Sequence, residues 1–415
     1  SGPVREPAYT PYRRLAWGTS SDMTTVEATT RPGAAADAVA GVVPREVARP
    51  HDAAEVAELL RSGAGSGTTV VPVGGRSKLG WCPPPRSCDL VLETAGLDRI
   101  VEHTAGDLVV VAEAGVRLDA LQERLAEHRQ MLALDPPEPG ATLGGIVSAN
   151  ASGPRRLRYG TARDLLIGVT VVLADGTTAK SGGKVVKNVA GYDLGKLYTG
   201  AHGSLGVLVS TTWRLHPLPR AARVVEREVA DPDEAGRLAL RVARSTLTPS
   251  AVELTGPAAG PMRMVVVFEA IQESVEAQAA HLVELVSGGE VADELRDDFG
   301  ERPHDGLVVR IAHVPAALSQ VLHSLPTGAS VVSSACSGVM YAGLGASAGA
   351  AELGELRAAI APFDGTAVVL SAPDEVGADL DHWGPVGDSL DLMRRVKGQF
   401  DPDGRLSPGR FVGGM

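Results

Sequence analysis

The sequence is short of several features that would each have indicated a class of protein. It has only three cysteines, Cys82, Cys88 and Cys336, in 415 residues. These fit neither a disulfide framework nor the closely spaced thiolates that hold an iron–sulfur cluster. Lys and Arg number 39 against 50 Asp and Glu, a net charge of -11, and no basic run is interleaved with aromatic residues. Nucleic acids and anionic membrane surfaces are therefore expected to be poor partners.

Long apolar runs are also missing. No stretch reaches the roughly 18 residues of a membrane-spanning helix, and the first residues lack a secretory signal pattern, so we expect no transmembrane segment and a cytoplasmic location. Residues 1–22 have no periodicity, and we leave them out of fold reasoning as a leader or as residues foreign to the native protein. The whole chain is 44% hydrophobic, enough for a real core, and its 415 residues fit two or three domains.

Alternating helix and strand patterns predict an α+β protein. Helical spacing of apolar residues at 53–64 and 116–130 surrounds strands at 68–73, 88–94 and 107–115. Asp175-Gly176 between two β-rich runs predicts a hairpin within 164–183. Beyond Pro217 and Pro219 the pattern changes, and it predicts a second α+β unit. Its helices are expected near 232–246, 273–287 and 350–361, and its strands near 263–269, 307–313, 330–342 and 366–371.

Four glycine-bearing segments compete as ligand sites. GLGASA at 343–348 fits a dinucleotide-binding fingerprint but lies late in a small α+β unit. We therefore interpret it as a chance match and not as a nucleotide-binding turn. VGGRSKLG at 73–80 ends a strand without opening a helix, and its backbone N–H groups could form an anion-binding nest. GATLGGIVSANASG at 140–153 and TGAHGSLG at 199–206 have small residues where a rigid cofactor would press against the backbone.

In that order, the last three segments resemble the FAD-binding domain shared by vanillyl-alcohol oxidase and p-cresol methylhydroxylase. Within that family, residues 46–219 look most like the smaller FAD-binding subunit of bacterial glycolate oxidase, and the likeness returns at FDPDGRLSPGR near the C-terminus. The resemblance implies a leader at 1–45, expected to be flexible, and an FAD-binding domain at 46–219 with subdomains 46–98 and 99–219. It also implies an α+β cap at 220–388 and a tail at 389–415 that returns to the FAD domain.

The resemblance also implies FAD-binding residues, carried over position by position. Those expected around the pyrophosphate are Gly74, Gly75, Arg76, Ser77, Lys78, Thr142, Gly144, Gly145 and Ser148. Those expected near the flavin are Ser152, Gly153 and Tyr159, while Gly203, Gly206 and Val207 complete the pocket and Arg410 anchors the tail. KNVAGYDL at 187–194 looks like the connection beneath the flavin, which would place Lys187 close to the ring and make Tyr192 and Asp193 architectural.

Several residues depart from the family pattern, and they bear on how FAD is attached and on whether a metal is bound. Covalent relatives carry a histidine where this chain has Arg76, so the FAD should be non-covalent. His202 replaces the usual Glu of the last glycine turn, and Ser407 replaces the usual Asn of the tail. The cap motif of two histidines flanking Gly-Asp-Gly-Asn is missing, and DHWGPVGDS at 381–389 lacks the second histidine. We therefore expect no bound metal.

The implied function is FAD-dependent oxidation of a small 2-hydroxy acid, glycolate or D-lactate, by hydride transfer to flavin N5. Such chemistry also needs a base for the hydroxyl proton and a cation for the carboxylate. Arg310, on a predicted strand at 306–315, is the candidate carboxylate clamp, with His313 and Lys187 as further catalytic candidates.

Arg310 and His313 each have an alternative interpretation without a catalytic role. Arg310 could be an arginine on the solvent face of its strand, and His313 could be a surface histidine at the strand end. The function also has alternatives. One is an FAD-holding relay or structural subunit whose flavin sister subunit performs catalysis, with an iron–sulfur subunit as a further partner. Another is a stand-alone oxidase of a different alcohol.

Overall fold

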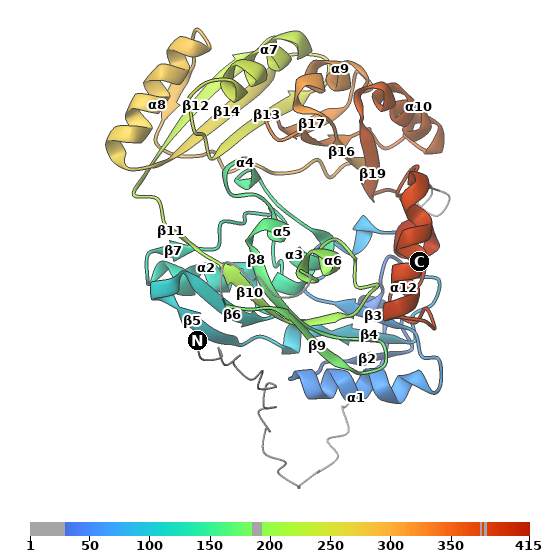
Figure 1. The fold of residues 1–415 in the computed structure, drawn as a ribbon. Coiled ribbons are helices and arrows are strands. Elements are labelled where there is room, and N and C mark those ends of the chain that lie inside the picture. The colour runs from blue at the N-terminus through green and yellow to red at the C-terminus, as the bar shows by residue number, and fades with distance from the viewer. Residues whose placement is uncertain (1–29, 185–192, 374–375, 377–379) are drawn as a thin grey trace, which may run out of the picture.

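The computed structural model describes residues 30–184, 193–373, 376 and 380–415, and Figure 1 shows two layers of structure facing each other. The lower part contains a small four-stranded sheet in the order β1-β2-β4-β3. Its strands are β1 (Thr30–Pro32), β2 (Glu46–Ala48), β3 (Val70–Val73) and β4 (Leu90–Glu93). Helix α1 (Ala53–Ala64) begins where Asp52 accepts hydrogen bonds from the N–H groups of Ala54 and Glu55. The helix predicted at 53–64 is thereby confirmed.

A five-stranded antiparallel sheet, in the order β5-β6-β10-β8-β9, lies beside it. Its strands are β5 (Ile100–Thr104), β6 (Val109–Glu113), β8 (Leu166–Val172), β9 (Thr178–Gly182) and β10 (Val207–Arg214). The hairpin predicted at Asp175-Gly176 is confirmed, because β8 and β9 pair antiparallel and Gly176 has a φ of 82°. The short elements around this sheet are α2 (Leu118–Ala126), β7 (Gln130–Met131), α3 (Leu143–Ala149), α4 (Arg156–Tyr159), α5 (Ala162–Leu165), α6 (Gly195–Tyr198) and β11 (His216–Pro217).

The upper part is an eight-stranded antiparallel sheet, which we call the cap sheet, in the order β15-β12-β14-β13-β17-β18-β16-β19. Its strands are β12 (Ala221–Val229), β13 (Ala251–Pro257), β14 (Met262–Ala270), β15 (Glu290–Ala292), β16 (Val308–Ala312), β17 (Ser330–Ser334), β18 (Val339–Gly343) and β19 (Thr366–Ser371). The single strand expected over 330–342 is wrong: β17 and β18 form a hairpin, with Gly338 at a φ of 65° in the turn.

Helices cover one face of the cap sheet and leave the other face toward the lower part (Figure 1). They are α7 (Pro232–Ala243), α8 (Gln272–Leu285), α9 (Leu318–His323) and α10 (Ala350–Ile360). Val309 and Ile311 of β16 belong to the core under these helices, whereas Val308 packs on the opposite face with Tyr341 and Trp81. Because side chains alternate along a strand, this division decides which residues of the cap sheet look toward the lower part.

The C-terminal tail returns to the lower part, as Figure 1 shows for α12 (Leu390–Phe400). Leu406 bridges to Val70 in parallel register, so the tail lies along the free edge of β3. Arg405 donates to the carbonyl oxygens of Leu60, Thr68 and Ala174, and its side chain is almost fully buried. The tail is therefore part of the lower core.

Two expectations about the chain as a whole can be compared with this fold. The flexible leader expected up to residue 45 is wrong for residues 30–45, where β1 pairs with β2 and Asp37 is only 6% exposed. The domain limits expected at 46–219, 220–388 and 389–415 stay predictions. Within the part of the chain that the structure describes, no helix combines the length and apolar character needed to cross a bilayer.

Candidate functional site

The loop after β3 presents a row of backbone donors. Within the described residues, the N–H groups of Gly74 to Lys78 donate no hydrogen bond to another protein group. Arg76 has a φ of 58°, so the chain bends into a concave turn there. Lys78 adds its charge beside Ser77, whose Oγ lies 3.0 Å from Nζ. Free donors in such a turn form an anion-binding nest, as the sequence predicted.

Close packing of the chain explains the two glycines of this loop. A Cβ on Gly75 would lie 1.9 Å from the carbonyl oxygen of Gly140, and one on Gly74 would lie 2.3 Å from Thr142 Oγ1. The loop is thus pressed against the start of α3, where Thr142 Oγ1 accepts the Gly145 N–H at 3.3 Å. These glycines allow the loop and the start of α3 to lie close together, because any side chain would force the two segments apart. Both segments carry backbone N–H groups of the kind that bind phosphate.

A cavity that is partly open to solvent joins these segments to the turn before β10 and to the tail. Most of the residues predicted to bind the cofactor line it together. They are Gly74, Gly75, Arg76, Ser77, Lys78, Thr142, Gly144, Gly145, Ser148, Gly203, Gly206 and Arg410. Small residues on three walls and free backbone donors on the first fit an elongated diphosphate cofactor. We call this cavity the glycine pocket.

Four further residues that were predicted to contact the cofactor do not line the glycine pocket, and their contacts with FAD stay predictions. Val207 is 0% exposed in a core cluster, so its side chain reaches no cavity. Tyr159 packs edge-on against His216, 4.9 Å away between ring centroids, and lines a separate cavity. Gly153 is packed on the carbonyl oxygen of Asp135, and Ser152 accepts a hydrogen bond from Arg156. The separation arises because α4 turns the chain toward the cap sheet.

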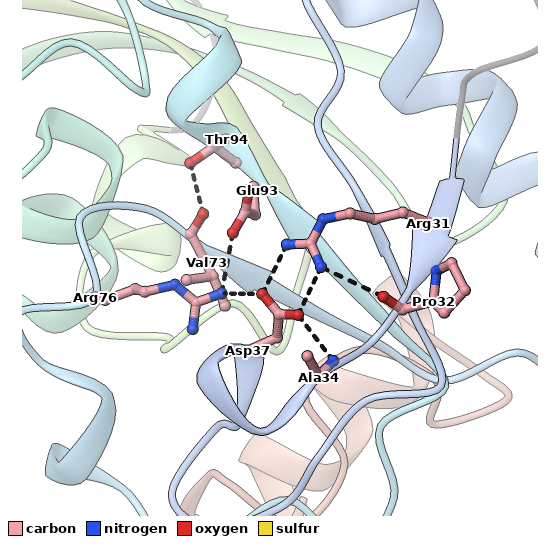
Figure 2. A network of polar contacts seen from close by, with 8 residues as sticks. All are labelled: Arg31, Pro32, Ala34, Asp37, Val73, Arg76, Glu93 and Thr94. Atoms are coloured by element: carbon pink, nitrogen blue, oxygen red, sulfur yellow. Dashed lines mark hydrogen bonds and ion pairs between the residues drawn. The ribbon is translucent and has the colours of Figure 1, made fainter.

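The Arg76 side chain is held away from a role as a phosphate clamp. Figure 2 shows its guanidinium beside Glu93, at 3.0 Å, and Asp37, at 3.8 Å. Asp37 also receives two hydrogen bonds of 2.7 Å from Arg31, which hold the pKa of its carboxyl well below the ordinary value. Arg76 can therefore serve a bound anion through its backbone, while its side chain ties the loop to β4 and the N-terminal segment.

The tail and the last glycine turn close the pocket. Arg410 donates to the carbonyl oxygens of Leu79 and Pro83 at 2.7 and 3.2 Å, while its predicted role at the cofactor stays a prediction. His202 lines the pocket with Nδ1 3.0 Å from Cys82 Sγ. Burial, assisted by the charges of Arg410 and Arg310, lowers the pKa of His202 to about 3. At neutral pH this histidine is uncharged, unlike the glutamate that it replaces.

Arg310 projects from the face of the cap sheet that looks toward the lower part. It shares that face with Val308 and sits opposite Tyr341 on β18. Trp81, in the 3₁₀ turn Leu79–Trp81 directly after the glycine loop, packs into the same cluster. The alternative of a solvent-facing arginine is therefore wrong. Among the described residues, none forms a hydrogen bond or ion pair with Arg310, and burial lowers its pKa.

The other catalytic candidates are placed less favourably. His313 is 7% exposed, so the surface alternative is wrong, but the strand alternation puts it on the Ile311 side, under the helices. Its Nδ1 lies 2.8 Å from the Val314 carbonyl oxygen. Lys187 and Tyr192 lie outside the described residues. Asp193 forms an exposed pair with Lys196, which suits the architectural role expected of it.

A buried cluster that the sequence did not reveal links the glycine loop to the cap sheet. The guanidinium of Arg302 lies over the rings of Trp81 and Tyr341, 4.9 and 4.1 Å from their centroids. Its guanidinium also donates to the Ser152 carbonyl oxygen at 2.8 Å and is ion-paired with Glu138, which lies 3.4 Å from Lys78. Glu138 stands inside the PPEPG segment that precedes α3, but nothing in an irregular stretch such as ERPHDG signals Arg302.

Glu253 is a second buried carboxyl on the inward face of the cap sheet. It is 2% exposed and accepts a hydrogen bond from Ser334 Oγ at 2.5 Å. Burial raises its pKa from 4.5 to about 7, and the nearby Asp135 adds to the rise while Arg302 and Arg156 oppose it. Asp135, which lines another cavity between cap and lower part, has a pKa raised to about 6 by burial.

This shift predicts a pH dependence of folding stability. Glu253 binds its proton more tightly in the folded protein than in the unfolded chain, where its pKa is 4.5. Its contribution is therefore complete below about pH 4.5 and is lost as the pH rises through about 7, by roughly 3 kcal/mol in total. In urea unfolding at pH 5 and pH 8, Glu253→Gln should show a clearly smaller loss of stability than wild type. Equal losses in the two proteins would contradict the shift.

No metal centre is evident in the described residues, where no group of three or more His, Cys, Asp or Glu side chains is placed to hold an ion. The expectation of a protein without bound metal stays a prediction. GLGASA at 343–348 lies between β18 and α10 in the cap and is not part of the glycine pocket.

Known protein families match the same two regions of the chain. An FAD binding domain matches residues 44–182, and the C-terminal domain of FAD linked oxidases matches residues 381–411. Glycolate oxidase subunit GlcE of Escherichia coli strain K12 is 39% identical over 133 residues, which are 32% of this chain and 38% of that protein.

Two D-lactate dehydrogenases are similar over longer stretches. The mitochondrial D-lactate dehydrogenase [cytochrome] 1 of Saccharomyces cerevisiae is 32% identical over 214 residues, 51% of this chain and 36% of that protein. The enzyme of Archaeoglobus fulgidus is 32% identical over 250 residues, 56% of this chain and 55% of that protein. The chain thus spans between about a third and just over half of these relatives' length.

A solved structure of alkyldihydroxyacetonephosphate synthase has the same fold. It covers 88% of this chain and 76% of its own, with a TM-score of 0.66 at 14% sequence identity. The glycine pocket, the two family matches and this fold agree on the cofactor domain. Residues 44–182 are thus similar to FAD binding domains and residues 381–411 to the C-terminal domain of FAD linked oxidases, which is consistent with an FAD-binding domain of the vanillyl-alcohol oxidase and p-cresol methylhydroxylase type.

Proposed function

We propose that this protein is an FAD-dependent oxidoreductase that oxidises a small 2-hydroxy acid, glycolate or D-lactate. The observation that carries the proposal is Arg310, a cation without a hydrogen bond or ion pair among the described residues, on the face of the cap sheet that packs with Trp81, shortly after the glycine loop. The similarity to D-lactate dehydrogenases and to a glycolate oxidase subunit supports this substrate class.

The glycine pocket supplies the holding groups for FAD. The free N–H donors of Gly74 to Lys78 and the ammonium of Lys78 would face the pyrophosphate, and the small residues of α3 and of the 203–206 turn would leave room for it. Arg76, which pairs with Glu93 and Asp37, stands at the position where covalent relatives have a histidine. The lack of a histidine at this position supports non-covalent binding of FAD. When bound, the flavin supplies the two-electron acceptor.

Arg310 is suited to hold a carboxylate. Burying a guanidinium in part without a counter-ion costs free energy, because the charge loses contact with water. A bound carboxylate would offset this cost through two parallel hydrogen bonds. The hydroxyl proton also needs an acceptor. His313 faces the helices, whereas Lys187 lies outside the described residues and keeps its candidacy as a prediction.

The test is the visible flavin spectrum of the purified protein, recorded anaerobically before and after addition of glycolate or D-lactate. We expect bleaching with at least one of the two acids. Arg310→Ala should keep its FAD but lose about 100-fold in the second-order rate of reduction, since truncating one partner of a buried charge pair costs a few kcal/mol. Arg263→Ala, which removes an arginine of β14 paired with Asp298, is the matched control and should leave that rate unchanged.

A relay or structural subunit is the second candidate, favoured by the similarity to a glycolate oxidase subunit. In that case a flavin sister subunit would perform catalysis and an iron–sulfur subunit would carry electrons onward. A yellow protein that neither acid reduces would support this candidate, or an oxidase of a different alcohol, and would overturn the proposal. A cytoplasmic location also stays a prediction.

A further inference from the structure

His202 lies where the glycine turn before β10, the loop after β3 and the tail meet. It lines the glycine pocket together with Gly203 and Arg410. Its backbone has a φ of 51°, and its N–H group donates to the Ser148 carbonyl oxygen of α3 at 2.9 Å. The backbone therefore fixes this histidine at the wall of the cavity, and its ring is the part that can contact a bound molecule.

Two aromatic side chains near the C-terminus pack against the His202 ring. Its centroid lies 5.3 Å from that of Trp383, at an interplanar angle of 68°, and 6.3 Å from that of Phe411. Trp383 and Phe411 also pack edge-on against each other, with 5.6 Å between their centroids. Such ring contacts favour defined orientations, so the two ring nitrogens of His202 keep different surroundings.

One of these nitrogens is in contact with a thiol. His202 Nδ1 lies 3.0 Å from Cys82 Sγ. Cys82 is 2% exposed, and burial raises its pKa to about 11, so the sulfur keeps its proton at neutral pH. The positive charge of Arg410, a side chain that can only donate hydrogen bonds, lies close to the same sulfur. This cation attracts the sulfur lone pairs, which leaves the S–H proton for Nδ1.

The contact with Cys82 decides the tautomer of His202. The imidazole is neutral at pH 7, because burial and the charges of Arg410 and Arg310 lower its pKa to about 3. A neutral ring carries one proton, and an Nδ1 that accepts from the thiol leaves that proton on Nε2. Within the described residues, no protein group accepts a hydrogen bond from Nε2. His202 therefore has one free N–H donor at the wall of the glycine pocket.

We propose that His202 binds the cofactor through Nε2–H, and that Cys82 is the positioning residue that holds the proton on this nitrogen. The group recognised is a hydrogen-bond acceptor of FAD. A carboxylate in place of the imidazole could not serve as such a donor at neutral pH. The inference rests on the glycine pocket as the FAD site and is independent of the substrate in the proposed function.

The test is titration of the FAD-free protein with FAD, followed by flavin fluorescence. His202→Phe keeps an aromatic ring but removes the donor, and it should weaken FAD binding about fivefold, the usual net effect of one hydrogen bond. His202→Gln places an amide donor near the position of Nε2 and should bind FAD about as tightly as wild type. His202→Glu has the same shape but only accepts, and it should bind roughly tenfold more weakly than His202→Gln. Equal affinities of the Gln and Glu variants would overturn the inference.

Nitrogen NMR of protein labelled with ¹⁵N-histidine tests the tautomer independently of affinity. At pH 7 the His202 signals, assigned by their loss in His202→Gln, should show a protonated Nε2 and an unprotonated Nδ1. Cys82→Val should populate the other tautomer and weaken FAD binding, whereas Cys82→Ser, which retains a hydroxyl donor, should behave like wild type in both measurements. A proton on Nδ1 in wild type would overturn the inference.

His103→Phe is the matched control. His103 is likewise half-buried and has one side-chain hydrogen bond, of 2.8 Å between Nε2 and Gln130 Oε1, but it lies on β5 and does not line the glycine pocket. FAD binding should be unchanged in this variant, and urea unfolding shows that both Phe variants fold. A loss equal to that of His202→Phe would overturn the inference.

The cofactor site and the proposed substrate fail in different ways. If the wild type binds no FAD, the glycine pocket is not the cofactor site and the role of His202 fails with it. If FAD binds and the His202 variants behave as expected but neither acid reduces the flavin, only the proposed function fails.

Discussion

Gly145→Leu should purify as a folded but colourless protein. Gly145 lies in α3 and lines the glycine pocket, and a Cβ there meets only Thr142 Oγ1, 3.1 Å away, within 4 Å. The added side chain therefore projects into the space for FAD rather than into the neighbouring chain. Overfilling such a site costs up to about 3 kcal/mol, which corresponds to roughly a hundredfold weaker binding. The measurement is flavin absorbance per protein, with circular dichroism to confirm folding.

Gly145 is a better probe than the glycines of the loop. A side chain on Gly75 would strike the Gly140 carbonyl oxygen, so loss of FAD there could follow from local distortion. Gly398→Leu is the matched control, because Gly398 is also helical, is exposed on α12 and has nothing within 4 Å of an added Cβ. Full flavin content in Gly145→Leu would show that the glycine pocket is not the cofactor site.

Lys397→Met should lower the free energy of unfolding by about 3–5 kcal/mol, the usual cost of leaving a buried charge without its partner. Lys397 Nζ donates to Asp401 at 2.6 Å and to the carbonyl oxygens of Ser204 and Leu406 at 2.6 and 2.9 Å. The Asp401 side chain is 0% exposed, so water cannot replace the ammonium. Because Ser204 adjoins Gly203 of the glycine pocket, FAD affinity should fall as well. Urea unfolding and flavin titration measure the two effects.

The control for this variant is Lys196→Met. Lys196 pairs with Asp193 at 2.7 Å, but both side chains are about half exposed, at 47% and 52%. Such surface pairs contribute at most about 1 kcal/mol, because water and salt screen them. Equal losses of stability in Lys196→Met and Lys397→Met would contradict the claim that burial of the tail pair locks the tail onto β3.

Local patterns predicted the secondary structure where one short-range cause dominates. Helix α1 follows from its apolar spacing and from Asp52, whose carboxylate caps it. The β8–β9 hairpin follows from Asp175-Gly176, since glycine readily adopts the positive φ of that turn. The β17–β18 hairpin was missed although its connection at 335–338 contains Ser337-Gly338, a dipeptide that marks turns.

The candidate site was predicted unevenly for a related reason. Glycine segments identify backbone positions, and those of the loop, α3 and the turn before β10 do meet in one pocket. The directions of the side chains could not be predicted in the same way. Arg76 turns to Glu93 and Asp37, and Tyr159 turns to His216, because each finds its partner in a distant part of the chain.

The sequence by itself determined the α+β class, most element positions and the FAD-binding segments, because backbone propensity and glycine conformation act over a few residues. Only the tertiary structure decided which face of the cap sheet packs with Trp81 of the lower part, and hence that Arg310 lies on that face and His313 lies on the opposite one. It alone brought Glu138, Trp81 and Arg302 together. Contacts between distant segments depend on how whole sheets pack, and no local pattern encodes that geometry.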